Sequence, residues 1–408
     1  MRFHHTRSSC DSSASTLDWL IVGGGIHGVH IAARLLGEAG VPADRLRILD
    51  PGTRLLERWR SCTATAGMTH LRSPSVHHLD LDPMSLQRFA GKRSTWKPGL
   101  FAPPFERPSL DLFNAHCDRV EETFGLSRLH LRDRAVRCAV DPEGVEVELS
   151  GGDVLHAGQL VLAIGGGEQP RWPDWAPVGD RRIQHVFDPG FDGWPEDNER
   201  VVVVGGGISA GHVVLRLLSD GHHVDHVTRH PLRHHQFDSD PGWLGTKYTT
   251  RFSREPDLEQ RRSMITRARH AGSVPPEMAR SLRRANKHRQ LCCHEAGVDR
   301  IEVEPHGLEV ALSTGSTLEV DRVLLATGFA SSRPGGRMIE ELIASASLRC
   351  APCGYPIVDA SLRWHSRIHV SGPLAELELG PVARNIAGAR RAADRIVDAI
   401  RATNGSVN

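Results

Sequence analysis

The sequence has few lysines, few aromatic residues and no long apolar run. Arginine is abundant, but lysine occurs only at Lys92, Lys97, Lys247 and Lys287. The 50 lysines and arginines are balanced by 49 acidic residues, so the near-zero net charge offers no electrostatic footprint for nucleic acid or an anionic membrane. No apolar stretch approaches the roughly 18 residues that a membrane span requires. We therefore expect partners other than nucleic acids and membranes.

The chain also lacks the features of a secreted protein. Residues 1–16 are polar and Ser-rich without an apolar centre, which predicts a mobile tail and not a signal peptide. The 8 cysteines are scattered, and a chain of 408 residues can bury its cores without disulfide bonds, so a cytoplasmic location is expected. The 24 histidines include adjacent pairs such as His77-His78, but no ligand set has zinc spacing, so no metal is predicted.

What the chain does have, twice, is a glycine-rich turn between a short apolar strand and a helix. A single Gly-x-Gly-x-x-Gly match is weak evidence, whereas two in this context indicate two bound dinucleotides and electron transfer between them. Glycine permits the tight turn and the close approach of a pyrophosphate, which then lies at a helix N-terminus. The predicted contacts are Gly23, Gly25 and Gly28 in the first box, and Gly205, Gly207, Ile208, Ser209 and Ala210 in the second.

The two boxes differ in the residue that ends the next strand. After the first box, the strand Leu46-Arg-Ile-Leu-Asp50 ends in an acid about 20 residues past the last glycine, where a carboxylate binds ribose hydroxyls. After the second box, the strand 222–228 runs into Arg229 and Arg233. Guanidinium groups bind a 2′-phosphate that a carboxylate would repel, so NADPH is the predicted second ligand. The alternative is that both arginines are solvated surface charges.

Two further apolar strands end in small residues and look like crossovers between domains. The first is Leu160-Val-Leu-Ala-Ile-Gly165, and the second leads into Ala326-Thr327-Gly328-Phe329. A proline-rich and acidic linker, 190–199, precedes the second box. The polar segment that follows Arg229 has helical patterns and is predicted to shape an active site.

These residues resemble the two-dinucleotide-binding flavoproteins, and within them the class B flavin monooxygenases that N-hydroxylate lysine or ornithine. The two boxes, the Ala-Thr-Gly-Phe motif and Gly380-Pro-Val-Ala-Arg-Asn385-Ile carry the resemblance, although Ile26 and Phe329 depart from the usual proline and tyrosine. The resemblance implies an α/β fold with two Rossmann-like domains of the three-layer ββα type. The discontinuous FAD domain would span 17–196 and 320–408, with the NADPH domain, 197–319, inserted and its helical segment 230–291 near the active site.

The resemblance also implies which residues lie near the flavin. The segment from Trp59 to Arg72 would approach the isoalloxazine, and the final helix would begin near Ala383. His70, Arg72 and Asn385 are the candidate catalytic residues, and for each the alternative is a packed or exposed structural role. The further cofactor contacts that it implies are Trp59, Met68, Val136, Gly165, Thr327, Gly328, Leu379, Gly380, Ala383 and Ile386.

By the same resemblance, NADPH reduces FAD, the reduced flavin captures O₂ as a C4a-hydroperoxide, and one oxygen atom passes to a small nucleophilic substrate such as an amine. Arg107 could bind a substrate carboxylate, and Asp238 or Asp240 an amine. One alternative is a flavin reductase or disulfide oxidoreductase that uses Cys350-Ala-Pro-Cys353. Another is a flavin-binding protein without catalysis. A homo-oligomer is compatible with the sequence.

Overall fold

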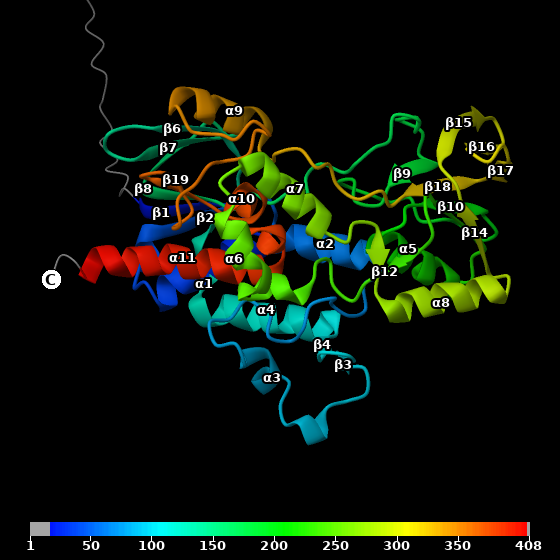
Figure 1. The fold of residues 1–408 in the computed structure, drawn as a ribbon, viewed down its shortest axis with the longest axis horizontal. Coiled ribbons are helices and arrows are strands. Elements are labelled where there is room, and N and C mark those ends of the chain that lie inside the picture. Colours follow the sequence, from blue (N-terminus) through cyan, green and yellow to red (C-terminus); the bar gives the residue numbers. More distant parts are fainter. Residues whose placement is uncertain (1–16, 406–408) are drawn as a thin grey trace, which may run out of the picture.

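Two α/β units lie side by side along the long axis of the molecule (Figure 1). The computed structural model describes residues 17–405. The larger unit contains the N-terminal strand and the C-terminal helix, and the smaller one is built around the strand of the second glycine box. Within residues 17–405, no helix is both long and apolar enough to cross a bilayer.

The larger unit is built on a sheet in the order β19-β20-β8-β1-β2-β5. Its central strand, Leu17–Val22, is apolar except at Asp18 and pairs in parallel with a strand on each side, as expected for a strand that is buried on both faces. An antiparallel ribbon of two strands extends from β8. The strands are β1 (Leu17–Val22), β2 (Leu46–Leu49), β5 (His130–Leu131), β6 (Ala135–Val140), β7 (Val145–Leu149), β8 (Val154–Leu162), β19 (Arg363–His365) and β20 (Ile368–Val370).

Helices cover one face of this sheet, and the β6–β7 ribbon and another helix cover the other (Figure 1). The first face carries α1 (Ile26–Gly37), α4 (Leu110–Phe124) and α11 (Ile386–Gly405), and the second carries α9 (Gly336–Ser345). Helices α1 and α11 pack closely, with an ion pair of 2.7 Å between Arg34 and Asp394. The result is the three-layer arrangement that was predicted.

The smaller unit repeats this plan around the parallel sheet β14-β11-β10-β18-β9. Val201 and Val203 of its central strand pack against α5 and α8, whereas Val202 and Val204 pack against a three-stranded antiparallel sheet. The elements are β9 (Ile183–His185), β10 (Val201–Val204), α5 (Ile208–Ser219), β11 (Val224–Thr228), α8 (Pro276–Lys287), β14 (Leu291–Glu295), β15 (Val298–Glu304), β16 (Gly307–Leu312), β17 (Thr317–Val320) and β18 (Arg322–Leu325). The predicted fold class is confirmed.

The hydrogen-bonded sheets divide the chain differently from the predicted domain boundaries. Strands β9 and β18 lie in stretches that were assigned to the flavin domain, but both belong to the sheet of the second glycine box. An apolar strand next to a crossover has the same sequence pattern in either sheet. Only the strand with which it pairs shows to which unit it belongs. The inserted unit therefore includes 183–185 and 322–325.

The segment 230–291 is helix-rich, as expected, and lies against the C-terminal part of the larger unit. Apolar side chains including Trp243 and Phe252 pack there on Tyr355 and Val382. Glu376 is fully buried and forms ion pairs with three arginines, namely Arg262, Arg269 at 3.5 Å and Arg384 at 2.7 Å. The elements not yet given are α2 (Glu57–Ala66), α3 (Ser85–Phe89), β3 (Phe101–Ala102), β4 (Arg107–Pro108), β12 (Arg233–His234), α6 (Thr246–Arg254), α7 (Leu258–Ala268), β13 (Ser273–Val274) and α10 (Glu376–Leu379).

Candidate functional site

The first glycine box is closely packed at two glycines and open at the third. Gly23 has a φ of 112°, and a Cβ there would lie 2.4 Å from the carbonyl oxygen of Ala163. A Cβ on Gly28 would lie 1.8 Å from the oxygen of Gly23, so neither position accepts a side chain. A Cβ on Gly25 would meet nothing within 4 Å. Gly25 therefore faces a space that a pyrophosphate could occupy.

The second box has the same construction. A Cβ on Gly205 would lie 2.4 Å from the carbonyl oxygen of Ala326, and one on Gly211 would lie 2.3 Å from the sulfur of Met278. Gly207 again has room, since the nearest atom is a backbone carbon of Gly272 at 3.7 Å. In both boxes, the first glycine packs against the backbone carbonyl of the alanine that follows the neighbouring strand.

Both helices that follow the boxes have a glycine as the N-cap residue, Gly25 for α1 and Gly207 for α5, and no side chain of the described residues caps either N-terminus. The unpaired backbone N–H groups and the helix dipole make each a binding site for an anion such as a phosphate. Asp50 stands beside the first box, where its carboxylate accepts hydrogen bonds from the backbone of Gly24 at 2.7 Å and of Gly52 at 2.9 Å. The remaining lone pairs can accept ribose hydroxyls.

Arg229 and Arg233 lie just beyond β11, beside the second box. Both are exposed, and neither side chain forms an ion pair or hydrogen bond with any residue that the structure describes. Between them, the ring of His230 lies over the box, because its Cε1 would be 3.1 Å from a Cβ on Gly206. Two free guanidinium groups are therefore available at the place where the adenosine end of a dinucleotide would lie.

The residues expected around the flavin come from both ends of the larger unit. Trp59 donates from Nε1 to Asn114 at 3.2 Å, and Met68 packs against the core of that unit. Thr327 donates to the carbonyl oxygen of Arg171, while Gly165 and Gly328 have positive φ and open space beside them. Val136 is exposed on β6. These assignments stay predictions.

The C-terminal segment offers mainly its backbone. The side chains of Leu379, Ala383 and Ile386 are buried in the protein core, so only their backbone could contact a cofactor. Gly380 has a φ of 78° and lies against the ring of Trp243, where a Cβ would be 3.4 Å from the nearest ring carbon.

Asn385 caps the final helix. Its Oδ1 accepts a hydrogen bond from the backbone N–H of Gly388 at 3.0 Å, as an N-cap residue does. The helix begins at Ile386 and not near Ala383, so that prediction was wrong by about one turn. The reason is a short 3₁₀ turn over Pro381–Arg384, which the sequence pattern does not distinguish from an α-helix.

The other two candidate catalytic residues are held by backbone carbonyls. The Nε2 of His70 lies 2.7 Å from the carbonyl oxygen of Gly99. Arg72 donates to the carbonyl oxygens of residues 235–237 in the inserted unit. Arg107 is buried and paired with Glu277 at 2.7 Å, so it is not free to bind a substrate carboxylate as the sequence suggested.

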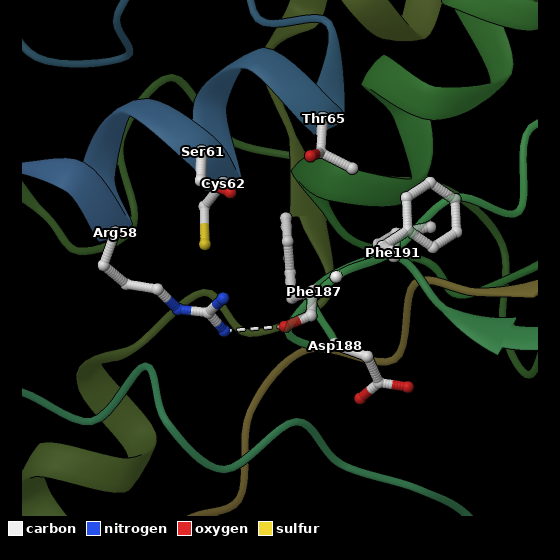
Figure 2. A pocket seen from close by; sticks show the side chains of 9 residues that line it. Arg58, Ser61, Cys62, Thr65, Phe187, Asp188 and Phe191 are labelled. Atoms are coloured by element: carbon white, nitrogen blue, oxygen red, sulfur yellow. Dashed lines mark hydrogen bonds between the residues drawn. The ribbon is translucent and has the colours of Figure 1, made fainter. Parts of the chain in front are cut away.

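One side chain that the sequence did not single out joins parts of the site. Arg58 of α2 donates to the carbonyl oxygens of Gly167 at 2.7 Å and Phe187 at 2.6 Å, and thereby ties the segments that follow β8 and β9 to α2. Figure 2 shows it beside a pocket of about 100 Å³, with Cys62 on the same helix and Phe187 opposite. Burial raises the pKa of the Cys62 thiol. Nothing in the sequence around Arg58 signals this role, because its partners are carbonyls far along the chain.

The Cys350-Ala-Pro-Cys353 pair lies in a turn before the C-terminal segment. Both cysteines are half-buried free thiols, and burial raises the pKa of Cys350. A thiol with a raised pKa is less reactive as a nucleophile near neutral pH. Among residues 17–405, no group of three or more histidines, cysteines or acids is arranged to hold a metal ion.

Comparisons with known proteins agree with this geometry. A family model described as FAD-NAD(P)-binding matches residues 20–167, and one described as pyridine nucleotide-disulphide oxidoreductase matches residues 127–392. No curated protein shows significant sequence similarity to the chain.

Several solved structures share the fold at low sequence identity. An ornithine hydroxylase from Pseudomonas aeruginosa is 17% identical, with a TM-score of 0.75 over 94% of this chain and 98% of its own. An ornithine N-hydroxylase from Kutzneria sp. 744, solved with reduced FAD, NADP⁺ and L-ornithine, is 16% identical, with a TM-score of 0.77 over 95% of this chain and 100% of its own. The bacillithiol disulfide reductase of Bacillus cereus is 17% identical, with a TM-score of 0.61 over 95% and 99%.

The predicted binding of FAD and a pyridine nucleotide is confirmed at the level of the family, and so is the prediction of a flavin-dependent oxidoreductase. The second family model covers more than half of the sequence, including the second box and both crossovers. The chain belongs to the pyridine nucleotide-disulphide oxidoreductase family.

Proposed function

We propose that the protein is an NADPH-driven, FAD-dependent monooxygenase that transfers one atom of O₂ to a small nucleophilic substrate such as an amine. The observation that carries this proposal is the pair of open helix N-termini, one with a ribose-binding carboxylate and one with free guanidinium groups. Bound FAD would accept a hydride and supply the chemistry with O₂. The protein's part is to bind, align and shield the two cofactors.

The first box suits FAD. The N-terminus of α1 would hold its pyrophosphate and Asp50 its ribose, while Gly380 and the N-terminus of α11 would lie at the other end of the site. A helix N-terminus favours nearby negative charge, which develops on a reduced flavin. The likeness to ornithine hydroxylases extends over almost the whole chain and supports the placement of FAD in this unit.

The second box suits NADPH more than NADH. No acid follows β11, and the exposed Arg229 and Arg233 have no protein partner among the described residues. An arginine binds a 2′-phosphate with charge-assisted hydrogen bonds that NADH cannot accept.

A second candidate function is the NADPH-dependent reduction of a disulfide. The family description and the likeness to a disulfide reductase support it. It would use the thiols of Cys350 and Cys353. The raised pKa of Cys350 weighs against this function. The double variant Cys350→Ser with Cys353→Ser separates the two, because oxygen transfer needs neither thiol.

The deciding experiment uses the FAD-loaded protein. NADPH is added without oxygen, and bleaching of the flavin absorbance reports hydride transfer. Oxygen is then admitted with and without a panel of small amines, and hydroxylated product is sought by mass spectrometry. Product formation supports the proposal. Rapid bleaching with no oxygenated product from any amine, together with disulfide reduction that the double serine variant loses, would replace it with the reductase.

A further inference from the structure

Besides the apolar cluster around Trp243 and the ion pairs of Glu376, arginines that donate to backbone carbonyls join the inserted unit to the flavin unit. Within residues 17–405, the chain crosses between the units at the segments around β9 and β18 and nowhere else. Units joined in this way are expected to move relative to each other unless specific contacts hold them. The contacts between them therefore bear on how a bound nicotinamide would meet the flavin.

Arg72 makes the most concentrated of these contacts. Its Nε donates to the carbonyl oxygen of Gln236 at 2.9 Å, and its Nη2 lies 2.6 Å from that of His235 and 2.8 Å from that of Phe237. The same Nη2 is 3.0 Å from the hydroxyl oxygen of Ser273. Four acceptors of the inserted unit thus surround one guanidinium group of the flavin unit.

Two other arginines also join the units. Arg107 of the flavin unit pairs with Glu277 at the start of α8. Arg216 of α5 reaches in the opposite direction, to the carbonyl oxygens of Ala64 at 3.2 Å and Thr65 at 3.3 Å. These carbonyls end α2, where the helix dipole favours a cation. All three contacts join the inserted unit to the flavin unit.

We propose that Arg72 is a positioning residue that fixes the inserted unit relative to the flavin unit, so that hydride transfer occurs without rotation of the domains. The part of this inference that concerns hydride transfer rests on the proposed function. Arg72 therefore does not act on the substrate directly, because its Nε and Nη2 atoms are already occupied by the inserted unit.

The chemistry of the guanidinium group makes the contact specific to arginine. Its planar fork places two donor nitrogens against successive carbonyls of one turn. Lysine keeps the charge but has a single donor atom, so it can satisfy only part of this set. Ser273→Ala removes the one side-chain acceptor and leaves Arg72 in place. It also removes the hydrogen bond that the Ser273 hydroxyl donates to the carbonyl oxygen of His270 at 2.6 Å.

The test compares Arg72→Met, Arg72→Lys and Ser273→Ala with a matched control, Arg283→Met, whose exposed side chain has no described partner. Hydrogen exchange of the peptide that carries the His235 amide, which donates to Val274 at 3.0 Å, reports local opening without any need for activity. We expect exchange to rise by about tenfold or more in Arg72→Met, less in Arg72→Lys and Ser273→Ala, and not at all in the control.

The second measurement is flavin reduction by NADPH under anaerobic conditions. We expect the rate constant at saturating NADPH to fall about tenfold in Arg72→Met while the half-saturating concentration changes little, with partial recovery in Arg72→Lys. Unchanged exchange in Arg72→Met and Ser273→Ala would overturn the proposal, as would raised exchange with an unchanged rate constant. If wild-type flavin is not reduced by NADPH, the proposed function fails, and the exchange data alone decide whether Arg72 fixes the interface.

Discussion

His27, on the first turn of α1, lies 2.7 Å from the hydroxyl oxygen of Ser371 through its Nδ1, although 344 residues separate them. The contact joins the first glycine box to the strand end that leads into the C-terminal segment. Burial lowers the pKa of His27 to about 4, so the ring is neutral near pH 7. Both ends of the predicted flavin site are thus connected by an uncharged hydrogen bond.

Gly25→Ala is expected to weaken FAD binding without harming the fold. The added methyl group meets no protein atom within 4 Å but enters the space assigned to the pyrophosphate. We expect the dissociation constant of FAD, measured by flavin fluorescence, to rise about tenfold or more with little change in the melting temperature of the apoprotein.

Gly28→Ala is the matched control, because its Cβ would lie 1.8 Å from a backbone oxygen and should destabilise the apoprotein itself. FAD binding to Gly25→Ala at the wild-type affinity would contradict the proposed site.

Arg229→Ala is expected to raise the Michaelis constant for NADPH and to leave that for NADH almost unchanged. The lost contact is a hydrogen bond between charged groups, worth roughly 1.5 to 3 kcal/mol, which corresponds to about 10- to 150-fold. Steady-state kinetics with both nucleotides measure it, and Arg283→Ala on α8 is the control. Equal losses with NADH and NADPH would remove the assignment to the 2′-phosphate.

Asn385→Ala should destabilise the protein by about 0.5 to 2 kcal/mol, because the cap of α11 is lost. Asn385→Asp keeps an acceptor oxygen for the Gly388 N–H and should retain most of the stability. Denaturant unfolding measures both variants. If Asn385→Asp is fully stable but loses activity, the side-chain amide has a role near the flavin beyond capping.

The free energy of unfolding should fall between pH 6.5 and pH 4. Burial lowers the pKa of several neutral histidines to about 4, namely His27, His78, His116, His185 and His369. Below pH 6.5 the unfolded chain binds protons at these rings and the folded chain does not, so acid favours unfolding.

The contribution of one such histidine, fully present above pH 6.5, is up to about 3 kcal/mol and is lost as the pH falls to 4. His185, which is fully buried, is a suitable single site. Urea unfolding at successive pH values measures the slope, and His185→Gln should reduce it. A stability that stays constant from pH 7 to pH 4 would show that these rings are protonated in the folded state.

The sequence determined the α/β plan with two units and the two glycine boxes that are predicted to bind dinucleotides. Glycine is required at Gly23 and Gly205 by a turn and a close backbone approach, and these constraints are local, so a short motif reveals them. The position of Asp50 beside the first box was predicted in the same way, because one helix and one strand set the number of residues between the box and this carboxylate.

Only the tertiary structure decided what the arginines and the crossover strands do. Arg72, Arg107 and Arg58 look alike in the sequence, but each is defined by carbonyls or a carboxylate from a distant segment. Likewise, only the pairing partners of strands β9 and β18 show that both strands belong to the inserted unit. Hydrogen bonds between segments far apart in the chain leave no periodic pattern in the sequence, because every residue has a backbone carbonyl. Which of these carbonyls accepts a hydrogen bond from a given arginine is therefore decided only when the chain folds.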